Sequence, residues 1–211
     1  MVKKKLPLTK ALLLSGGLCA ISPAHADGWR DIDSPNFLTD QNPVVIHQFL
    51  VAGDVFQYLS PALMYGVIAS RLDENGFWQG STTYMATMGT MAVLKNATLR
   101  KRPNNANDHQ SFPSGHVASV MAPAAFITVR YGFGDALPFW GFGILTAYSR
   151  IAGKKHFITD TLGSTGLSLL FAYLFTTPLS DEEKLQKGPK IFLSPTSYDG
   201  GGFGMSMAFD F

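Results

Sequence analysis

Cysteine is nearly absent from this sequence, whose 211 residues contain a single one, Cys19. One cysteine can form no internal disulfide and offers no cluster of thiolate ligands to a metal ion. Lipid modification of Cys19 is not indicated either, because Leu18 stands where a small residue is expected directly before a lipidated cysteine. The stability of the folded chain must therefore come from packing.

Charge is also scarce and nearly balanced. The chain has 17 basic and 15 acidic residues, a formal net charge of +2, and several of its lysines lie in the first ten positions. This balance gives no argument for a nucleic-acid partner. At this length the chain has room for one domain with a sizeable core.

The first 26 residues have the layout of a secretory signal peptide. Lysines precede an apolar run from Ala11 to Ile21, and Ala24-His25-Ala26 follows it. We predict cleavage after Ala26 and a periplasmic or otherwise extracytoplasmic mature protein. An uncleaved membrane anchor is the alternative, which the shortness of the apolar run disfavours.

The remainder is predicted to be an all-α bundle of about five to six helices, with the active site between helices. Residues 27–43 are polar and turn-rich, which indicates an N-terminal arm. The bundle is predicted over residues 44–180, because this region holds long apolar stretches rich in Ala, Leu and Met. Breaks at Gly, Pro, Asn or charged clusters divide it into stretches at 44–71, 77–100, 116–131, 136–152 and 156–178.

Long uncharged runs are few. Thr161 to Ser180 could cross a bilayer, but runs such as Val117 to Val129 are shorter, and the mean hydropathy of the chain is only +0.10. These features favour a water-soluble or surface-associated bundle over one that crosses the membrane several times, which remains the alternative.

The tail, residues 181–211, is predicted to be a linker followed by a β-hairpin. Apolar residues alternate with small or polar ones from Phe203 to Phe211, which is a strand period, and Lys190 to Ser194 is the expected partner across a Pro195–Gly202 loop. The hairpin either lies on the bundle, which we favour, or contacts the membrane.

Three clusters of polar residues suggest chemistry. In the first, Lys95 and Arg102 are seven residues apart, about two turns of a helix, so a helix would project both cations from one face and suit a phosphate. In the second, Pro113–His116 opens an apolar stretch. A helix starting there could be capped by Ser114, would present free amide groups to an oxyanion, and would place His116 as a proton donor.

The third cluster contains Arg150, His156 and Asp160. A carboxylate four residues after a histidine can hold one ring nitrogen as N–H and free the other as a nucleophile, and Arg150 offers a planar fork for two phosphate oxygens. Each cluster alone could equally be a solvated helix end, a plain helix cap or a surface ion pair.

In this order and spacing, the three clusters resemble the signature of the type-2 phosphatidic acid phosphatase superfamily. That superfamily includes bacterial class A acid phosphatases, lipid phosphatases and vanadium haloperoxidases. The resemblance is strong from Lys95 to Asp160, whereas the flanking helical stretches are only compatible with it. His47 and His109 match nothing in it, and His109 is at most a residue at the mouth of the site.

The resemblance implies a role for each residue. His156 attacks phosphorus to form a phosphohistidine, Asp160 orients His156, and His116 protonates the leaving oxygen. The phosphate-binding residues are Lys95, Arg102, Ser114, Gly115 and Arg150. No metal and no cofactor are implied.

These roles predict an extracytoplasmic, metal-independent phosphatase for lipid-linked or polyprenyl phosphates. The alternatives are a phosphotransferase to a lipid or sugar hydroxyl, an acid phosphatase for soluble organic phosphates, a haloperoxidase holding vanadate, and an envelope structural protein. The sequence does not predict an oligomeric state.

Overall fold

A computed structural model describes residues 43–104 and 107–180 with their side chains, and the backbone of residues 190–198 and 202–210. The predicted signal peptide at 1–26 and nearly all of the predicted arm at 27–43 lie outside the described residues.

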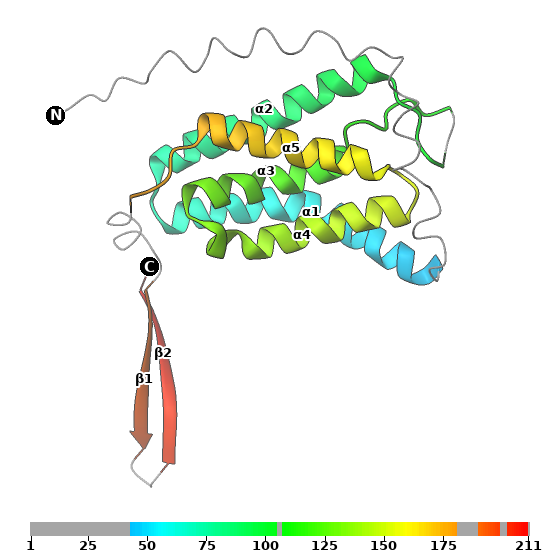
Figure 1. Ribbon diagram of the computed structural model, residues 1–211. Helices are drawn as coiled ribbons and strands as arrows, with labels where there is room; N and C mark the ends of the chain where they lie inside the picture. Colours follow the sequence, from blue (N-terminus) through cyan, green and yellow to red (C-terminus); the bar gives the residue numbers. More distant parts are fainter. Residues whose placement is uncertain (1–42, 105–106, 181–189, 199–201, 211) are drawn as a thin grey trace, which may run out of the picture. The chain divides into compact units, whose positions relative to one another are not determined.

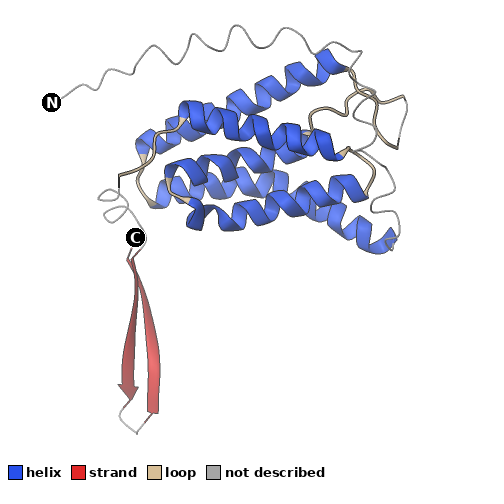
Figure 2. Cartoon of the chain, viewed as in Figure 1, coloured by secondary structure: helices blue, strands red, loops and turns tan. Residues whose placement is uncertain are grey.

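Each of the five predicted helical stretches is a helix, so the all-α prediction is confirmed for the bundle (Figures 1 and 2). The boundaries shift by a few residues. The second helix, for example, begins at Glu74 rather than 77, because the side chain of Asp73 accepts a hydrogen bond from the Gly76 amide and caps the helix there. The helices are α1 (Pro43–Ser70), α2 (Glu74–Thr98), α3 (Gly115–Arg130), α4 (Phe133–Ala152) and α5 (Ile158–Phe175).

Helix α3 is the centre of the bundle. It packs against all four other helices, while α1 pairs with α4 and α2 pairs with α5 around it (Figure 1). Its sequence is apolar on every side, and most of its residues, from Val117 to Ile127, are buried. A helix without a polar face is stable only when it is enclosed. Helix α1 contacts α2 much less, and α4 contacts α5 much less. Two seams therefore run along the bundle, one between α1 and α2 and the other between α4 and α5.

One end of the bundle holds a buried ionic cluster. The guanidinium of Arg130 donates hydrogen bonds to both carboxylate oxygens of Asp73, at 2.7 and 2.8 Å, and the Tyr131 hydroxyl donates a third at 3.0 Å. Arg130 also donates to the carbonyl of Thr177, beyond the end of α5. The cluster therefore ties the start of α2 and the end of α3 to the segment that follows α5.

The described backbone of the tail contains two antiparallel strands, β1 (Lys190–Tyr198) and β2 (Gly202–Asp210). Ile191 pairs with Phe209, and Ser194 pairs with Ser206. Both strands are longer than predicted and the loop is shorter, because pairing continues through Pro195 opposite Met205. In a two-stranded sheet every strand is an edge, where a proline without an N–H is tolerated.

Candidate active site

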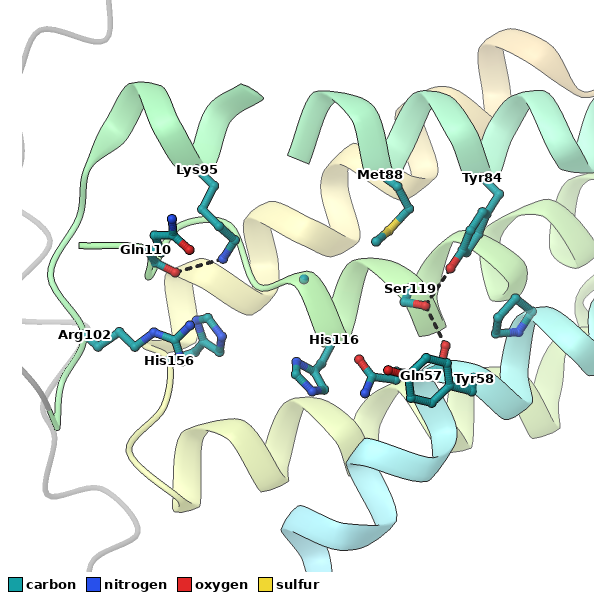
Figure 3. A pocket seen from close by; sticks show the side chains of 12 residues that line it. Gln57, Tyr58, Tyr84, Met88, Lys95, Arg102, Gln110, His116, Ser119 and His156 are labelled. Carbon is teal, nitrogen blue, oxygen red and sulfur yellow. Dashed lines mark hydrogen bonds between the residues drawn. The ribbon is translucent and has the colours of Figure 1, made fainter. Parts of the chain in front are cut away.

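A cavity of about 470 Å³ opens at the seam between α1 and α2, above the start of α3 (Figure 3). One part of its wall is cationic and contains Lys95, Arg102 and two histidines. The other part mixes amides, hydroxyls and apolar surface. The lining residues are Gln57, Tyr58, Pro61, Tyr84, Met88, Lys95, Arg102, Gln110, Gly115, His116, Ser119 and His156.

Lys95 lies in the last turn of α2, as predicted. Its ammonium donates hydrogen bonds to the backbone carbonyls of Gln110, at 2.8 Å, and Pro113, at 3.0 Å. An ammonium has three N–H donors, so two fix its position and a third is left for a bound anion.

The prediction that Lys95 and Arg102 project from one helix face is wrong. The residue after α2, Leu99, has a left-handed backbone with φ of 46° and ends the helix, so Arg102 lies in the following loop. Both side chains still line the cavity, and Arg102 is held by Asp108, whose Oδ2 lies 2.9 Å from its Nε. The loop, and not helical periodicity, brings the two cations together.

Ser114 occupies the predicted position at the start of α3, but its hydroxyl does not cap the helix. The side chain is fully buried, and its oxygen has no hydrogen-bond partner among the described residues. Its backbone is anchored to α5, because the Ser114 amide donates to the Asp160 carbonyl and the Ser114 carbonyl accepts from Ser164. Gly115, the next residue, lines the cavity.

His156 and Asp160 lie together, although not on one helix as predicted. Helix α5 begins only at Ile158, so His156 belongs to the preceding loop. Its Nδ1 atom lies 3.5 Å from Oδ2 of Asp160, within ion-pair range, but it has no hydrogen-bond partner among the described residues. The His156 ring lines the cavity, and since Nδ1 faces Asp160, Nε2 is the ring nitrogen available to a substrate.

Three further contacts hold the Asp160 carboxylate in place. It accepts hydrogen bonds from the Ser111 hydroxyl at 2.5 Å, the Arg100 guanidinium at 2.6 Å and the Phe157 amide at 2.8 Å. The Arg100 guanidinium also stacks 4.3 Å from the centre of the Phe157 ring. Neither Arg100 nor Ser111 was predicted from the sequence, because Arg100 resembles one more basic residue at a helix end and no spacing rule marks Ser111.

The surroundings of His156 favour its neutral form. Burial lowers the pKa of His156 below its ordinary value, and the positive charges of Lys95 and Arg102 lower it further, while Asp160 opposes both effects. A histidine with a lowered pKa carries a free ring nitrogen at neutral pH, which a nucleophile needs.

His116 and Arg150 meet at an acidic residue that the sequence analysis also missed. Asp54, on α1, places Oδ1 3.0 Å from Nε2 of His116 and 2.9 Å from Nη2 of Arg150. Arg150 lies in the last turn of α4, where Nη2 also donates to the Leu50 carbonyl at 2.6 Å. No spacing rule connects a carboxylate on the first helix to motifs so much later in the sequence.

The structure thus gathers the predicted residues in two groups. The cavity wall holds Lys95, Arg102, Gly115, His116 and His156. Buried outside that wall are Ser114, Arg150 and Asp160. His47 and His109 are exposed and are not among the lining residues. Within the described ranges, no three His, Cys, Asp or Glu side chains gather in a way that could hold a metal ion.

Comparison with known proteins identifies the family. Residues 77–183 match the PAP2 superfamily. A lipid A 4'-phosphatase from Helicobacter pylori is 32% identical over an alignment of 136 residues that covers 59% of this chain and 68% of that protein. The range 77–183 matched by the family includes all three motif clusters.

Two solved structures share the fold. LpxE from Aquifex aeolicus superposes with a TM-score of 0.52 at 18% identity, over 70% of this chain and 92% of that one. A transmembrane PAP2-type phosphatidylglycerolphosphate phosphatase from Bacillus subtilis gives a TM-score of 0.52 at 21% identity, over 64% and 77% of the two chains. The match over residues 77–183 and the 32% identity to a curated phosphatase show that the chain belongs to the PAP2 superfamily and is a phosphoric monoester hydrolase.

Proposed function

We propose that this enzyme removes a phosphate group from a membrane lipid by way of a phosphohistidine on His156. The observation that carries the proposal is the cavity itself, in which a cationic wall with a buried, neutral histidine continues into the seam between α1 and α2. The cationic wall suits the phosphate group, and the seam suits the lipid alcohol that carries it.

The reaction has two halves. In the first, Nε2 of His156 bonds to phosphorus while the bond from phosphorus to the leaving oxygen breaks, and His116 gives that oxygen a proton. In the second, water attacks phosphorus, the bond to His156 breaks, and His116 takes the proton that water loses. The net reaction consumes one ester and one water and yields an alcohol and inorganic phosphate.

Fixed positive charge stabilises the phosphoryl group in both halves. Lys95 and Arg102 face the cavity, and the amide of Gly115 lies in the first turn of α3, where helix N–H groups are free. We also assign phosphate contacts to Arg150 and to the buried Ser114 hydroxyl, which a phosphate oxygen would satisfy. In this scheme, the cations do the work that magnesium does in kinases.

The lining away from the cations supports a leaving group with a polar head and an apolar body. The Tyr84 and Ser119 hydroxyls form a hydrogen bond of 2.9 Å, and the Ser119 hydroxyl donates a hydrogen bond of 2.6 Å to the backbone carbonyl of Gln57 (Figure 3). Met88 and Pro61 extend the wall with apolar surface. We favour a phosphorylated glycolipid of the lipid A class, in line with the curated relative, over polyprenyl phosphates and soluble esters.

The distribution of side chains on the helices supports contact with a bilayer. On α5, the buried side carries small residues such as Ser164, Ser168 and Ala172, whereas the outer side exposes large apolar ones such as Leu169 and Tyr173. Helix α2 follows the same inverted pattern, which is typical of helices that pack in lipid. Helix α1 shares the exposed apolar side but buries Met64 and Ile68 as well as Gly53 and Ser60. The inverted pattern favours the membrane alternative that the sequence left open.

Length and composition single out one helix in the described part of the chain as a candidate span, α5 (Ile158–Phe175). We propose that the whole bundle nevertheless lies in the membrane, with the cavity at one surface. The signal-like segment at 1–26 supports an extracytoplasmic site, and the tail hairpin at 190–210 is a second candidate for membrane contact.

A substrate panel tests the proposal. The full-length protein in detergent should release phosphate from a lipid A-type phosphate faster than from undecaprenyl diphosphate, lysophosphatidate, phosphatidylglycerol phosphate or an aryl phosphate. His156→Ala should abolish release, His47→Ala should match the wild type, and EDTA should have no effect. Unchanged release by His156→Ala would refute the mechanism, and equal rates on all esters would refute the lipid assignment.

Two alternatives have their own readouts. A phosphotransferase uses the same residues, so the products should be analysed with and without an added sugar or lipid alcohol. Phosphorylated alcohol in place of inorganic phosphate would identify transfer. Halide oxidation on addition of vanadate would identify a haloperoxidase.

A further inference from the structure

Asp54 stands outside the motif pattern, yet one of its carboxylate oxygens touches two residues of the site. Oδ1 lies 3.0 Å from Nε2 of His116 and 2.9 Å from Nη2 of Arg150. The three residues come from α1, α3 and α4. The side chain of Asp54 is 53% exposed, and that of Arg150 only 6%.

We propose that Asp54 is a positioning residue that holds Nε2 of His116 as N–H, so that the proton given to the leaving oxygen comes from Nδ1. This rests on the proposed function, in which His116 is the general acid. Asp54 itself does not touch the reacting atoms.

The first argument is the orientation of the ring. An imidazole has two distinct nitrogens, and a carboxylate that engages one of them fixes both the tautomer and the direction of the other. With Nε2 turned to Asp54, Nδ1 is the nitrogen available to a substrate in the cavity, which His116 lines.

The second argument is electrostatic. The charged or titratable groups that act on His116 are Arg150 from α4, His156 from the loop before α5, and Asp54 from α1. To donate a proton from Nδ1 while Nε2 remains N–H, His116 must be protonated on both nitrogens, so it carries a positive charge beside Arg150. The Asp54 carboxylate, shared by both partners, offsets that repulsion at the moment when His116 is charged.

The third argument is that the neighbouring backbone holds Asp54 in place. A Cβ atom on Gly53 would lie 2.5 Å from the Ser149 hydroxyl and 2.8 Å from Nη2 of Arg150, so a larger residue would displace these two side chains from their present positions. The Leu50 carbonyl also accepts from Arg150 at 2.6 Å. The contact of Asp54 is therefore part of a close helix junction and not of a mobile surface side chain.

The test compares leaving groups. A phenol with electron-withdrawing substituents leaves without a proton, whereas an alkyl alcohol needs one, so loss of general acid catalysis slows alkyl esters most. The comparison uses kcat/KM, which reports the first half-reaction alone, because hydrolysis of the phosphohistidine is common to all esters. Asp54→Asn should lower kcat/KM for an alkyl phosphate by about 10²-fold and for 4-nitrophenyl phosphate by less than about 5-fold. An equal loss for both esters would overturn the proposal.

A double-variant cycle adds a second criterion. If Asp54 acts through His116, Asp54→Asn in a His116→Gln background should cause no further loss with the alkyl ester. Independent, multiplying losses would show that Asp54 acts elsewhere. Asp135→Asn is the matched control, because Asp135 forms an ion pair of similar exposure with Arg71. Asp135 lies in the first turn of α4, about 22 Å along that helix from Arg150, and so far from the site.

A readout without catalysis separates this proposal from the proposed function. Imidazole ¹⁵N shifts, assigned with His116→Gln, should show neutral His116 as the Nε2–H tautomer in the full-length protein and a mixture in Asp54→Asn. The same tautomer in both proteins would overturn the role of Asp54. A wild type that cleaves no ester would overturn only the proposed function, since the tautomer is read independently.

Discussion

Oδ2 of Asp160 lies 3.5 Å from Nδ1 of His156 and accepts a 2.5 Å hydrogen bond from the Ser111 hydroxyl. The carboxylate is fully buried, and the chain segments that precede α3 and α5 converge on it. The carboxylate that we propose to orient His156 is therefore itself fixed from several sides.

Asp160→Asn should lower kcat by about 10²- to 10⁴-fold with little change in KM, because the amide cannot hold His156 in the reactive tautomer. Steady-state kinetics on the best ester of the panel would measure the effect. Circular dichroism should show that the variant keeps its helices. A loss of less than 10-fold would mean that Asp160 does not orient the nucleophile.

Arg100→Gln should reduce kcat by about 10-fold, since it removes a charged partner of Asp160. The neighbouring Lys101→Gln provides the control, because Lys101 is exposed. Both substitutions remove one positive charge from the same loop. Equal effects of the two variants would assign the loss to net charge and not to the Asp160 contact.

The acid limb of kcat/KM should lie below pH 6.5. Protonation inactivates His156 as a nucleophile, and its lowered pKa moves that protonation to lower pH than for an ordinary histidine. The phosphate of the substrate also titrates near pH 6. Two esters with different second ionisations separate these events, since only a limb that both esters share belongs to the enzyme. A shared limb above pH 6.5 would contradict the assignment.

Gly53→Ala should reduce kcat/KM by at least about 10-fold, because its methyl group would collide with Ser149 and Arg150. Gly66→Ala lies on the same helix with nothing within 4 Å of the added carbon, so it should leave the kinetics unchanged. Similar behaviour of the two variants would show that the α1/α4 junction does not control the site.

Asp73→Ala should destabilise the fold by about 3–5 kcal/mol, because it leaves the buried Arg130 guanidinium without its carboxylate. Asp135→Asn, which breaks a more exposed ion pair, should cost less than about 1 kcal/mol. Thermal unfolding in the same detergent compares the two. Equal shifts in Tm would mean that the buried cluster is not the main tie at that end of the bundle.

Local sequence pattern predicted the helices well and the site less completely. The five stretches in 44–180 are long and apolar enough to be helices in any context, and the three motifs lie at their ends. Periodicity failed where the chain leaves the helix, as at Leu99 and before Ile158, because a left-handed residue or a late helix start places Arg102 and His156 in loops.

Long-range contacts were beyond the reach of spacing rules. Asp54 and Ser111 contact residues far away in the sequence, and only the packing of α1 and α5 around α3 brings them to the site. The mean hydropathy of the chain also does not show how apolar residues are distributed around each helix. The buried faces of α2 and α5 carry threonines, serines and glycines, so a hydropathy average hides how apolar their outer faces are.

The seam between α1 and α2 has a kinetic consequence in the proposed membrane placement. If both helices face lipid, a cavity that opens between them receives its ligand from the plane of the bilayer, so encounters are two-dimensional. The proposal therefore predicts a turnover rate that follows the mole fraction of phosphorylated lipid in the leaflet. Diluting that lipid with inert lipid should slow the enzyme, whereas diluting the vesicles with buffer should not.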